Sequence, residues 1–234
     1  MSPSSKNLIA LILVVLSATG CASMGEKDPY EKFNRQVFSF NDAIDRHALK
    51  PAATTYKAVM PEVAQTGVNN FFSNLADVWT GANNLLQGKA VNGLSDFGRV
   101  LVNSTVGVAG LFEVASKAGL PKHDEDFGQT LGYWGVPSGP YLMLPLLGPS
   151  TLRDAGALPI DMKADPWAIG ASGNLKLAGS MLRVVDHRAG LLDASELVDA
   201  AALDRYQFLR DDFLQRRLSK VSDGATSPSP VGDE

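Results

Sequence analysis

Apolar residues return every three or four positions along most of the chain, which is the spacing of one face of an α-helix. After Glu31 they fall at Phe33, Val37, Phe40 and Ile44, and Pro51 is expected to end this helix because it cannot continue the backbone hydrogen bonding. The same spacing predicts helices at 62–87, at 91–119 with glycines at 107 and 110 loosening the second half, at 175–185, from 193 onward and at 204–220.

The pattern predicts a single all-α domain. No segment shows the sustained polar/apolar alternation of a half-buried strand, and no internal repeat or linker divides the chain. We therefore expect one helical domain over residues 28–220. Residues 221–234 are polar and rich in Pro and Ser, so this end is expected to be a disordered tail.

One apolar stretch does not fit a helix. Residues 139–150 read GPYLMLPLLGPS, with Gly and Pro at both ends and Pro145 inside. Inside a core, an irregular backbone would leave unpaired polar groups at a cost of about 1–3 kcal/mol each. In water, its leucines would form a sticky patch. We therefore interpret the segment as an irregular hairpin at a membrane, with its side chains among acyl chains.

This hairpin is too short to cross a hydrocarbon core of about 30 Å, so it is expected to enter a single leaflet. Its candidate rim residues are Tyr141, Leu142, Met143, Leu144, Leu146 and Leu147.

The N-terminus has the features of a secretory signal peptide. Lys6 precedes an unbroken apolar run of residues 8–16, and small residues follow up to Cys21, the only cysteine of the chain. Cleavage by the general signal peptidase would leave Cys21 as an ordinary thiol. The alternative, which we favour, rests on the resemblance of residues 18–21 (ATGC) to the bacterial lipobox, and it implies a signal peptide at 1–20, lipid attachment at Cys21 and a tether at 21–27. Ala22 favours the outer membrane by resemblance to enterobacterial sorting rules.

Composition and charge exclude several classes of protein. The chain is 45% hydrophobic and 20% charged, which is ordinary for a folded protein, and its formal charge of −4 comes without a basic block that could follow nucleic-acid phosphates. No nucleophile elbow, Walker loop or dinucleotide fingerprint is present, so no catalytic residue or cofactor is expected. The three histidines are scattered, and the run at 123–126 (HDED) lacks the spacing of a calcium loop, so no metal site is expected.

Several short motifs resemble one family. They occur in order over about residues 28–220: DPYEKFNR at 28–35, FN at 40–41, KP at 50–51, NLLQGK at 84–89, NSTVG at 103–107, FGQTLG at 127–132, WGV at 134–136, GPY at 139–141 and LGPSTLRD at 147–154. In this combination the chain is similar to the MlaA (VacJ) outer-membrane lipoproteins.

The resemblance implies a ring-like helical protein in the inner leaflet of the outer membrane, anchored on the periplasmic side, with an amphipathic channel through its middle. It also implies removal of misplaced phospholipids from the outer leaflet, delivery to a periplasmic carrier of the MlaC type, and association with trimeric porins. Such a channel needs polar side chains for the lipid head beside an apolar route for the tails.

The candidate channel residues are Asn74, Asn84, Arg99, Asn103 and Arg153. For Arg153 a salt bridge to neighbouring Asp154 is an equal alternative. Two other functions stay open: a lipid hydrolase, for which no activated nucleophile is visible, and a structural porin-associated lipoprotein without transport activity.

Overall fold

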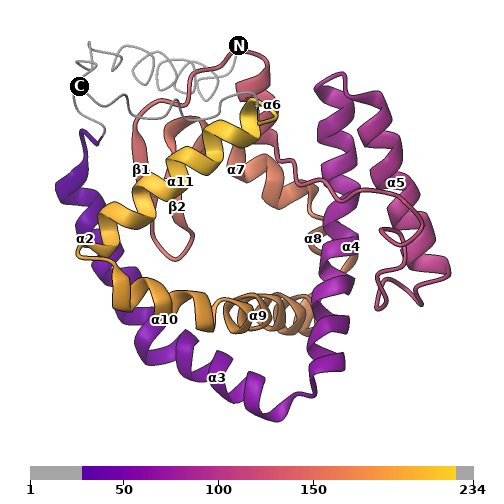
Figure 1. Ribbon diagram of the computed structural model, residues 1–234, viewed down its shortest axis with the longest axis horizontal. Helices are drawn as coiled ribbons and strands as arrows, with labels where there is room; N and C mark the ends of the chain where they lie inside the picture. Colours follow the sequence, from indigo (N-terminus) through magenta and orange to yellow (C-terminus); the bar gives the residue numbers. More distant parts are fainter. Residues whose placement is uncertain (1–27, 225–234) are drawn as a thin grey trace, which may run out of the picture.

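The helices form a ring (Figure 1). The computed structural model describes residues 28–224. The elements in chain order are α2 (Glu31–Ile44), η1 (Asp45–Leu49), α3 (Lys50–Val59), α4 (Glu62–Leu86), α5 (Ala90–Thr105), α6 (Phe127–Tyr133), β1 (Tyr141–Leu144), β2 (Gly148–Thr151), α7 (Leu152–Ala164), α8 (Pro166–Gly170), α9 (Gly173–Gly190), α10 (Leu192–Ala201) and α11 (Arg205–Val221). The expected signal peptide at 1–20, the tether at 21–27 with Cys21, and residues 225–234 of the tail expected at 221–234 lie outside the described residues.

The first side of the ring is one continuous helical arm made of α2, the π-helical turn η1 and α3. The expectation that Pro51 ends the first helix is wrong, because Pro51 lies in the first turn of α3. The wider turn directly before Pro51 accommodates a ring that would clash with the preceding carbonyl in a regular α-helix. The arm therefore bends at η1 and does not break.

The opposite side is the antiparallel pair α4 and α5, which lie side by side in Figure 1. Two glycines allow close approach of the helices, since a Cβ added at Gly93 would lie 2.9 Å from the carbonyl oxygen of Gly81. The expected continuation of the second helix through residue 119 is wrong, because α5 ends at Thr105. Val108 and Ala109 then adopt φ values of 51° and 56°, which a helix cannot accommodate.

Residues 141–151 form an antiparallel β-hairpin, not an irregular one. Tyr141 pairs with Thr151 and Leu144 with Gly148. Leu146 at φ 64° lies in the turn, and Gly148 at φ 84° begins β2 directly after it. Strand pairing gives the backbone polar groups of the hairpin hydrogen-bond partners. The cost expected for burying an irregular segment therefore does not arise.

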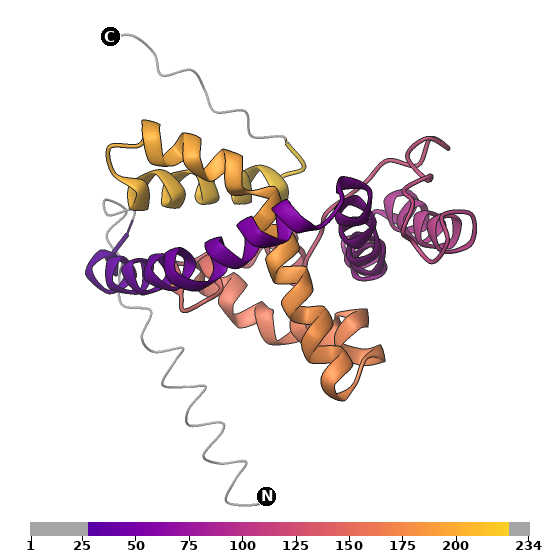
Figure 2. The same cartoon turned by 90° about the horizontal axis from the view of Figure 1, so that it is seen from below.

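The C-terminal helices close the ring. Seen from below, α10 and α11 lie on one side of the α2–α3 arm, and α9 runs past the arm toward α8 on the other side (Figure 2). An ion pair between Arg35 on α2 and Asp204 at the start of α11 joins the two ends at 2.7 Å. Helix α11 extends one residue beyond the expected domain boundary, to Val221.

Burial is reversed relative to a water-soluble domain. Among the described residues, more polar and charged side chains than hydrophobic ones are buried, including Asn34, Asn83, Asp96 and Arg99. Large apolar side chains instead lie on the outside of nearly every helix, such as Val91 at 82% exposed. Within residues 28–224, no helix combines the length and the apolarity needed to span a membrane.

Candidate functional site

A central cavity of about 470 Å³ lies between the arm, α4, α9 and the hairpin tip. Both apolar and polar side chains line it. The apolar side chains are Leu49, Phe72, Ala76, Leu146 and Val184, and the polar ones are Asn69, Ser73, Arg183, Asp186, His187 and Arg188. A molecule with a charged head and apolar tails matches such a wall.

The charged groups of the cavity are held by partners on other elements. Arg188 on α9 donates to both carboxylate oxygens of Asp45 on η1, at 2.7 and 2.9 Å, and to Ser195 Oγ at 3.2 Å. Asp186 accepts a hydrogen bond from the Tyr56 hydroxyl at 2.8 Å. Burial, followed by this bond, raises the pKa of Tyr56, so the hydroxyl stays protonated as a donor. These contacts join α9 to the arm at the edge of the cavity.

Two asparagines of α2 hold the hairpin in place. Asn34 donates to the carbonyl of Tyr141 at 3.1 Å and accepts from the amide of Met143 at 2.8 Å. Asn41, two turns further on, donates to the carbonyl of Leu144 at 2.9 Å and accepts from the amide of Leu146 at 2.8 Å. The two amides occupy the free edge of β1 where a third strand would otherwise lie.

The six candidate rim residues separate into three groups. Tyr141 and Met143 are not at a rim, since they are 1% and 2% exposed and pack with Tyr206 in the core. Alternation along the strand explains this, because every second side chain faces the α2 and α11 side. Leu142 and Leu144 are half-buried. Leu146 and Leu147 at the tip are 68% and 60% exposed.

Four of the five candidate channel residues lie in a polar seam between α4 and α5. Asn74 donates to Ser104 Oγ at 3.0 Å, and Asn84 donates to Asp96 at 2.8 Å. Asn103 accepts from the amides of residues 114 and 115. All four are at most 4% exposed, and none lines the central cavity.

Arg99 is the fourth member of this seam. It donates to Asp77 at 3.1 Å, to Glu113 at 3.0 Å and to the carbonyl of Leu120 at 2.7 Å. Its guanidinium is fully used in joining the two helices and the turn after α5. The structure thus places these side chains inside the wall of the ring, where they fix its shape.

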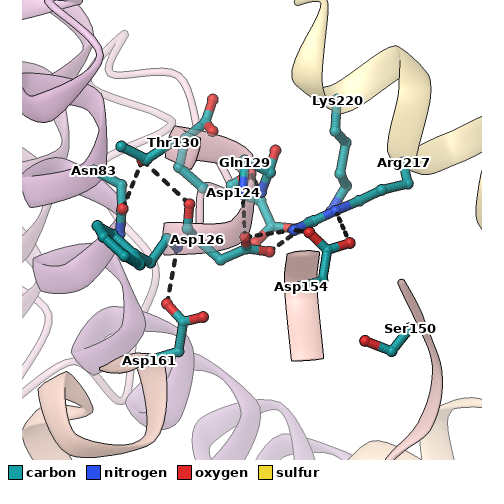
Figure 3. A network of polar contacts seen from close by, with 12 residues as sticks. Asn83, Asp124, Asp126, Gln129, Thr130, Ser150, Asp154, Asp161, Arg217 and Lys220 are labelled. Carbon is teal, nitrogen blue, oxygen red and sulfur yellow. Dashed lines mark hydrogen bonds and ion pairs between the residues drawn. The ribbon is translucent and has the colours of Figure 1, made fainter. Parts of the chain in front are cut away.

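Arg153 forms the salt bridge that was the alternative to a channel position, 3.0 Å from Asp154. Asp154 belongs to a network that joins α6, α7 and α11 (Figure 3). Arg217 donates to Asp126 at 2.5 and 2.7 Å and to Asp154 at 2.8 and 2.9 Å. Burial opposes ionisation of Asp126, but the bonds and charge of Arg217 outweigh it and lower the Asp126 pKa.

A second cavity, of about 250 Å³, adjoins the central one. Ala76 and Arg183 line both. Its other residues include Trp79 and five carboxylates, those of Asp124, Glu125, Asp126, Asp161 and Asp165. Burial raises the pKa of Asp161, which accepts from Trp79 Nε1 at 2.7 Å and from the amide of Phe127 at 2.9 Å. Among residues 28–224 no group of His, Cys, Asp or Glu has the geometry to hold a metal ion.

Of the residues that line the central cavity, sequence reasoning identified only Leu146, as a candidate rim residue. Periodicity predicted a helix at 175–185, which includes Arg183, but α9 continues to Gly190 and so also includes Asp186 and Arg188. The partners of these two are far away in sequence, at Tyr56 and Asp45. The only available signal was a charged cluster at the end of an apolar helical face, within DHR at 186–188.

Comparisons with known proteins agree on one family. A family model described as "MlaA lipoprotein" matches residues 26–220. The protein of Escherichia coli (strain K12) named "Intermembrane phospholipid transport system lipoprotein MlaA" is 34% identical over 234 residues, covering 94% of this chain and 91% of that protein. An uncharacterized protein of Rickettsia felis is 34% identical over 195 residues, covering 83% and 78%.

A solved structure described as "Structural basis for maintenance of bacterial outer membrane lipid asymmetry" superposes with a TM-score of 0.73 at 33% identity, covering 83% of this chain and 98% of that one. The family resemblance of the sequence motifs is thereby confirmed, together with the ring of helices expected from it. The chain belongs to the MlaA lipoprotein family.

Proposed function

We propose that this protein takes phospholipids out of the outer leaflet of an outer membrane and passes them through its central cavity toward the periplasm. The family and the curated relatives named for intermembrane phospholipid transport support this function. The result would be maintenance of lipid asymmetry in that membrane.

The reversed burial pattern supports this proposal most strongly. Exposed apolar side chains on α2, α5, α7 and α9 suit acyl chains as a solvent, while the buried polar seam would gain nothing from lipid contact. The central cavity, lined by both apolar and polar side chains, would then supply a route across one leaflet. A phospholipid needs both kinds of side chain during passage.

The hairpin tip fits the position of a lip at the entrance to this route. Leu146 lines the central cavity, and Leu147 beside it is 60% exposed. The Asn34 and Asn41 hydrogen bonds hold the strand leading to the tip. A hairpin tip held in this way would let the lipid tails pass along its leucines, while the lipid head group contacts the polar side chains of the cavity.

The remaining parts of the proposal concern anchorage and partners. Cys21 would carry the lipid anchor, seven positions before Asp28, where the described fold begins. We further propose a soluble periplasmic carrier of the MlaC type as the acceptor and trimeric porins as neighbours in the membrane. No nucleotide-binding motif is present in the sequence, so the driving force would come from the lipid gradient or a partner.

Deletion of the gene tests the function directly. Outer-leaflet phospholipid should rise in the deletion strain and return to normal with the wild-type gene. A variant with Leu146→Asp and Leu147→Asp should be present in the membrane and fail to restore it, whereas Asp193→Asn, at an exposed surface position, should restore it fully. Unchanged outer-leaflet phospholipid in the deletion strain would favour a structural porin-associated lipoprotein. Release of fatty acid from labelled phospholipid by the purified protein would instead indicate a hydrolase.

A further inference from the structure

Arg183 on α9 is the cation that separates the two adjoining cavities. It lines both the central cavity and the side cavity that contains the five carboxylates. Its guanidinium carbon lies 5.6 Å from the centre of the Phe72 ring, one of the apolar side chains that line the central cavity. The charge of Arg183 is therefore presented close to both an apolar ring and the acidic side cavity.

Arg183 makes fewer hydrogen bonds and is more exposed than Arg188, the other arginine that lines the central cavity. Arg188 makes three hydrogen bonds and its side chain is 12% exposed. Arg183 makes one hydrogen bond, from Nη1 to Asp165 at 2.8 Å, and its side chain is 38% exposed. Its other guanidinium nitrogens have no hydrogen-bond partner among residues 28–224. A ligand can bind them without breaking a buried network.

We propose that Arg183 binds the phosphate of the lipid head group and makes the cavity prefer zwitterionic over anionic phospholipids. This inference rests on the proposed transport function. A guanidinium matches two phosphate oxygens at once, and the Phe72 side of the cavity receives the tails. The other charged or titratable groups that line the central cavity, Asp186, His187 and Arg188, lie on the same helix.

The preference for zwitterions follows from what lies behind Arg183. Three of the five carboxylates of the side cavity form ion pairs with cations that do not line it, Lys89, Arg217 and Lys220, and Asp165 pairs with Arg183 itself. The amine of phosphatidylethanolamine would be attracted there, whereas the uncharged glycerol of phosphatidylglycerol would gain no such attraction. Arg183 takes the phosphate and the carboxylates take the amine.

Asp165 competes with the lipid phosphate for Arg183. The proposal therefore predicts that removal of the Asp165 charge strengthens lipid binding. Asp165 also caps α8, because its Oδ1 accepts from the amide of Trp167 at 3.0 Å. Asparagine caps helices as well as aspartate does. Asp165→Asn should therefore keep α8 intact and release Arg183, so that phospholipid binds more tightly.

The experiment uses the full lipidated chain in detergent micelles and short-chain fluorescent lipids. The probes are phosphatidylethanolamine, phosphatidylglycerol and diacylglycerol, which lacks the phosphate. We expect the wild type to bind them in that order. Arg183→Gln should weaken phosphatidylethanolamine binding roughly tenfold and remove the discrimination against diacylglycerol. Arg183→Lys should fall between, and Asp165→Asn should bind phosphatidylethanolamine severalfold more tightly than the wild type.

Matched controls separate a head-group contact from a structural ion pair. Arg216→Gln removes an exposed arginine that pairs with Asp212 within α11, and it should change nothing. Equal weakening by Arg183→Gln and Asp165→Asn would show that the pair merely joins α8 to α9, and it would overturn the proposal. So would an unchanged preference for phosphatidylethanolamine over diacylglycerol in Arg183→Gln.

Three further outcomes are decisive. If water-soluble glycerophosphoethanolamine competes as well as the intact lipid, the site recognises a free phosphodiester and the lipid assignment is wrong. If the wild type binds none of the three lipids, the proposed function itself fails. If the wild type binds and Arg183→Gln binds identically, the transport proposal stands and the role of Arg183 is refuted.

Discussion

At the scale of single residues, side-chain amides replace backbone partners at two places in the ring. Asn34 holds the free edge of β1, and Asn103 accepts from two successive amides of the turn after α5, both at 2.9 Å. Asparagine can do this because its amide donates and accepts in a fixed geometry similar to that of a peptide group. In a ring with little apolar core, such contacts fix the shape.

Asp161 gives a residue-scale prediction about pH. Burial raises its pKa, so the unfolded chain loses this proton before the folded chain does as the pH rises. Stability should therefore fall between the ordinary aspartate pKa of about 3.9 and the higher folded value. Asp161→Asn keeps an oxygen acceptor for Trp79 Nε1 and removes the charge, so it should be more stable than the wild type at pH 7.

Urea unfolding in detergent micelles, followed by tryptophan fluorescence, checks this at pH 7 and at about pH 3, below the ordinary aspartate range. The difference between the two proteins should vanish at the acidic pH. Asp193→Asn, whose side chain is 84% exposed, is the control and should show no such gain. A variant less stable than the wild type at pH 7 would contradict the prediction.

At the scale of elements, periodicity in the sequence located the helices. It did not show where the helices break, or whether protein or lipid covers their apolar faces. The helices at 62–87 and 204–220 were predicted within one or two residues of α4 and α11. The π-turn before Pro51 and the left-handed residues after Thr105 depend on local geometry that periodicity does not report. The hairpin was missed as a strand pair because its edge partners, Asn34 and Asn41, lie more than 100 residues away.

Asn34 allows an element-scale prediction. Asn34→Leu fills a similar volume but leaves the amide of Met143 and the carbonyl of Tyr141 without partners. We expect a loss of about 2–4 kcal/mol in the free energy of unfolding, because two buried polar groups lose their hydrogen bonds. Proteolysis should also become faster at the hairpin tip, where Leu146 is exposed.

Asn92 on α5 provides the comparison, since its side chain makes no hydrogen bond among the described residues. Asn92→Leu should change the free energy of unfolding by less than about 0.5 kcal/mol. Equal effects of the two substitutions would show that the hydrogen bonds of Asn34 to β1 contribute nothing to stability.

At the scale of the whole molecule, the apolar faces of the helices are turned away from the protein interior. The apolar positions Val91, Leu94 and Leu101 of α5 are 82%, 67% and 66% exposed, while Asp96 and Arg99 on the other face are buried against α4. Sequence periodicity identifies a stripe, but it does not say whether protein or lipid covers it. Four of the five candidate channel residues lie in the α4–α5 interface for the same reason, because a polar stripe also fits a sealed helix interface.

The outward stripes predict that membrane association and folding can be separated. Leu94→Gln with Leu101→Gln should leave the free energy of unfolding in detergent nearly unchanged, since neither side chain packs inside the ring. Each leucine buried in lipid is worth roughly 1.5–3 kcal/mol, so binding to vesicles should fall by about two orders of magnitude or more. Flotation of the chain with Cys21→Ser, which removes the proposed anchor, measures this without the contribution of acyl chains. Glu196→Gln, at an exposed polar position, should float like its parent. Unfolding of the double variant would mean that α5 packs its leucines against protein, and undiminished flotation would mean that this face does not contact the bilayer.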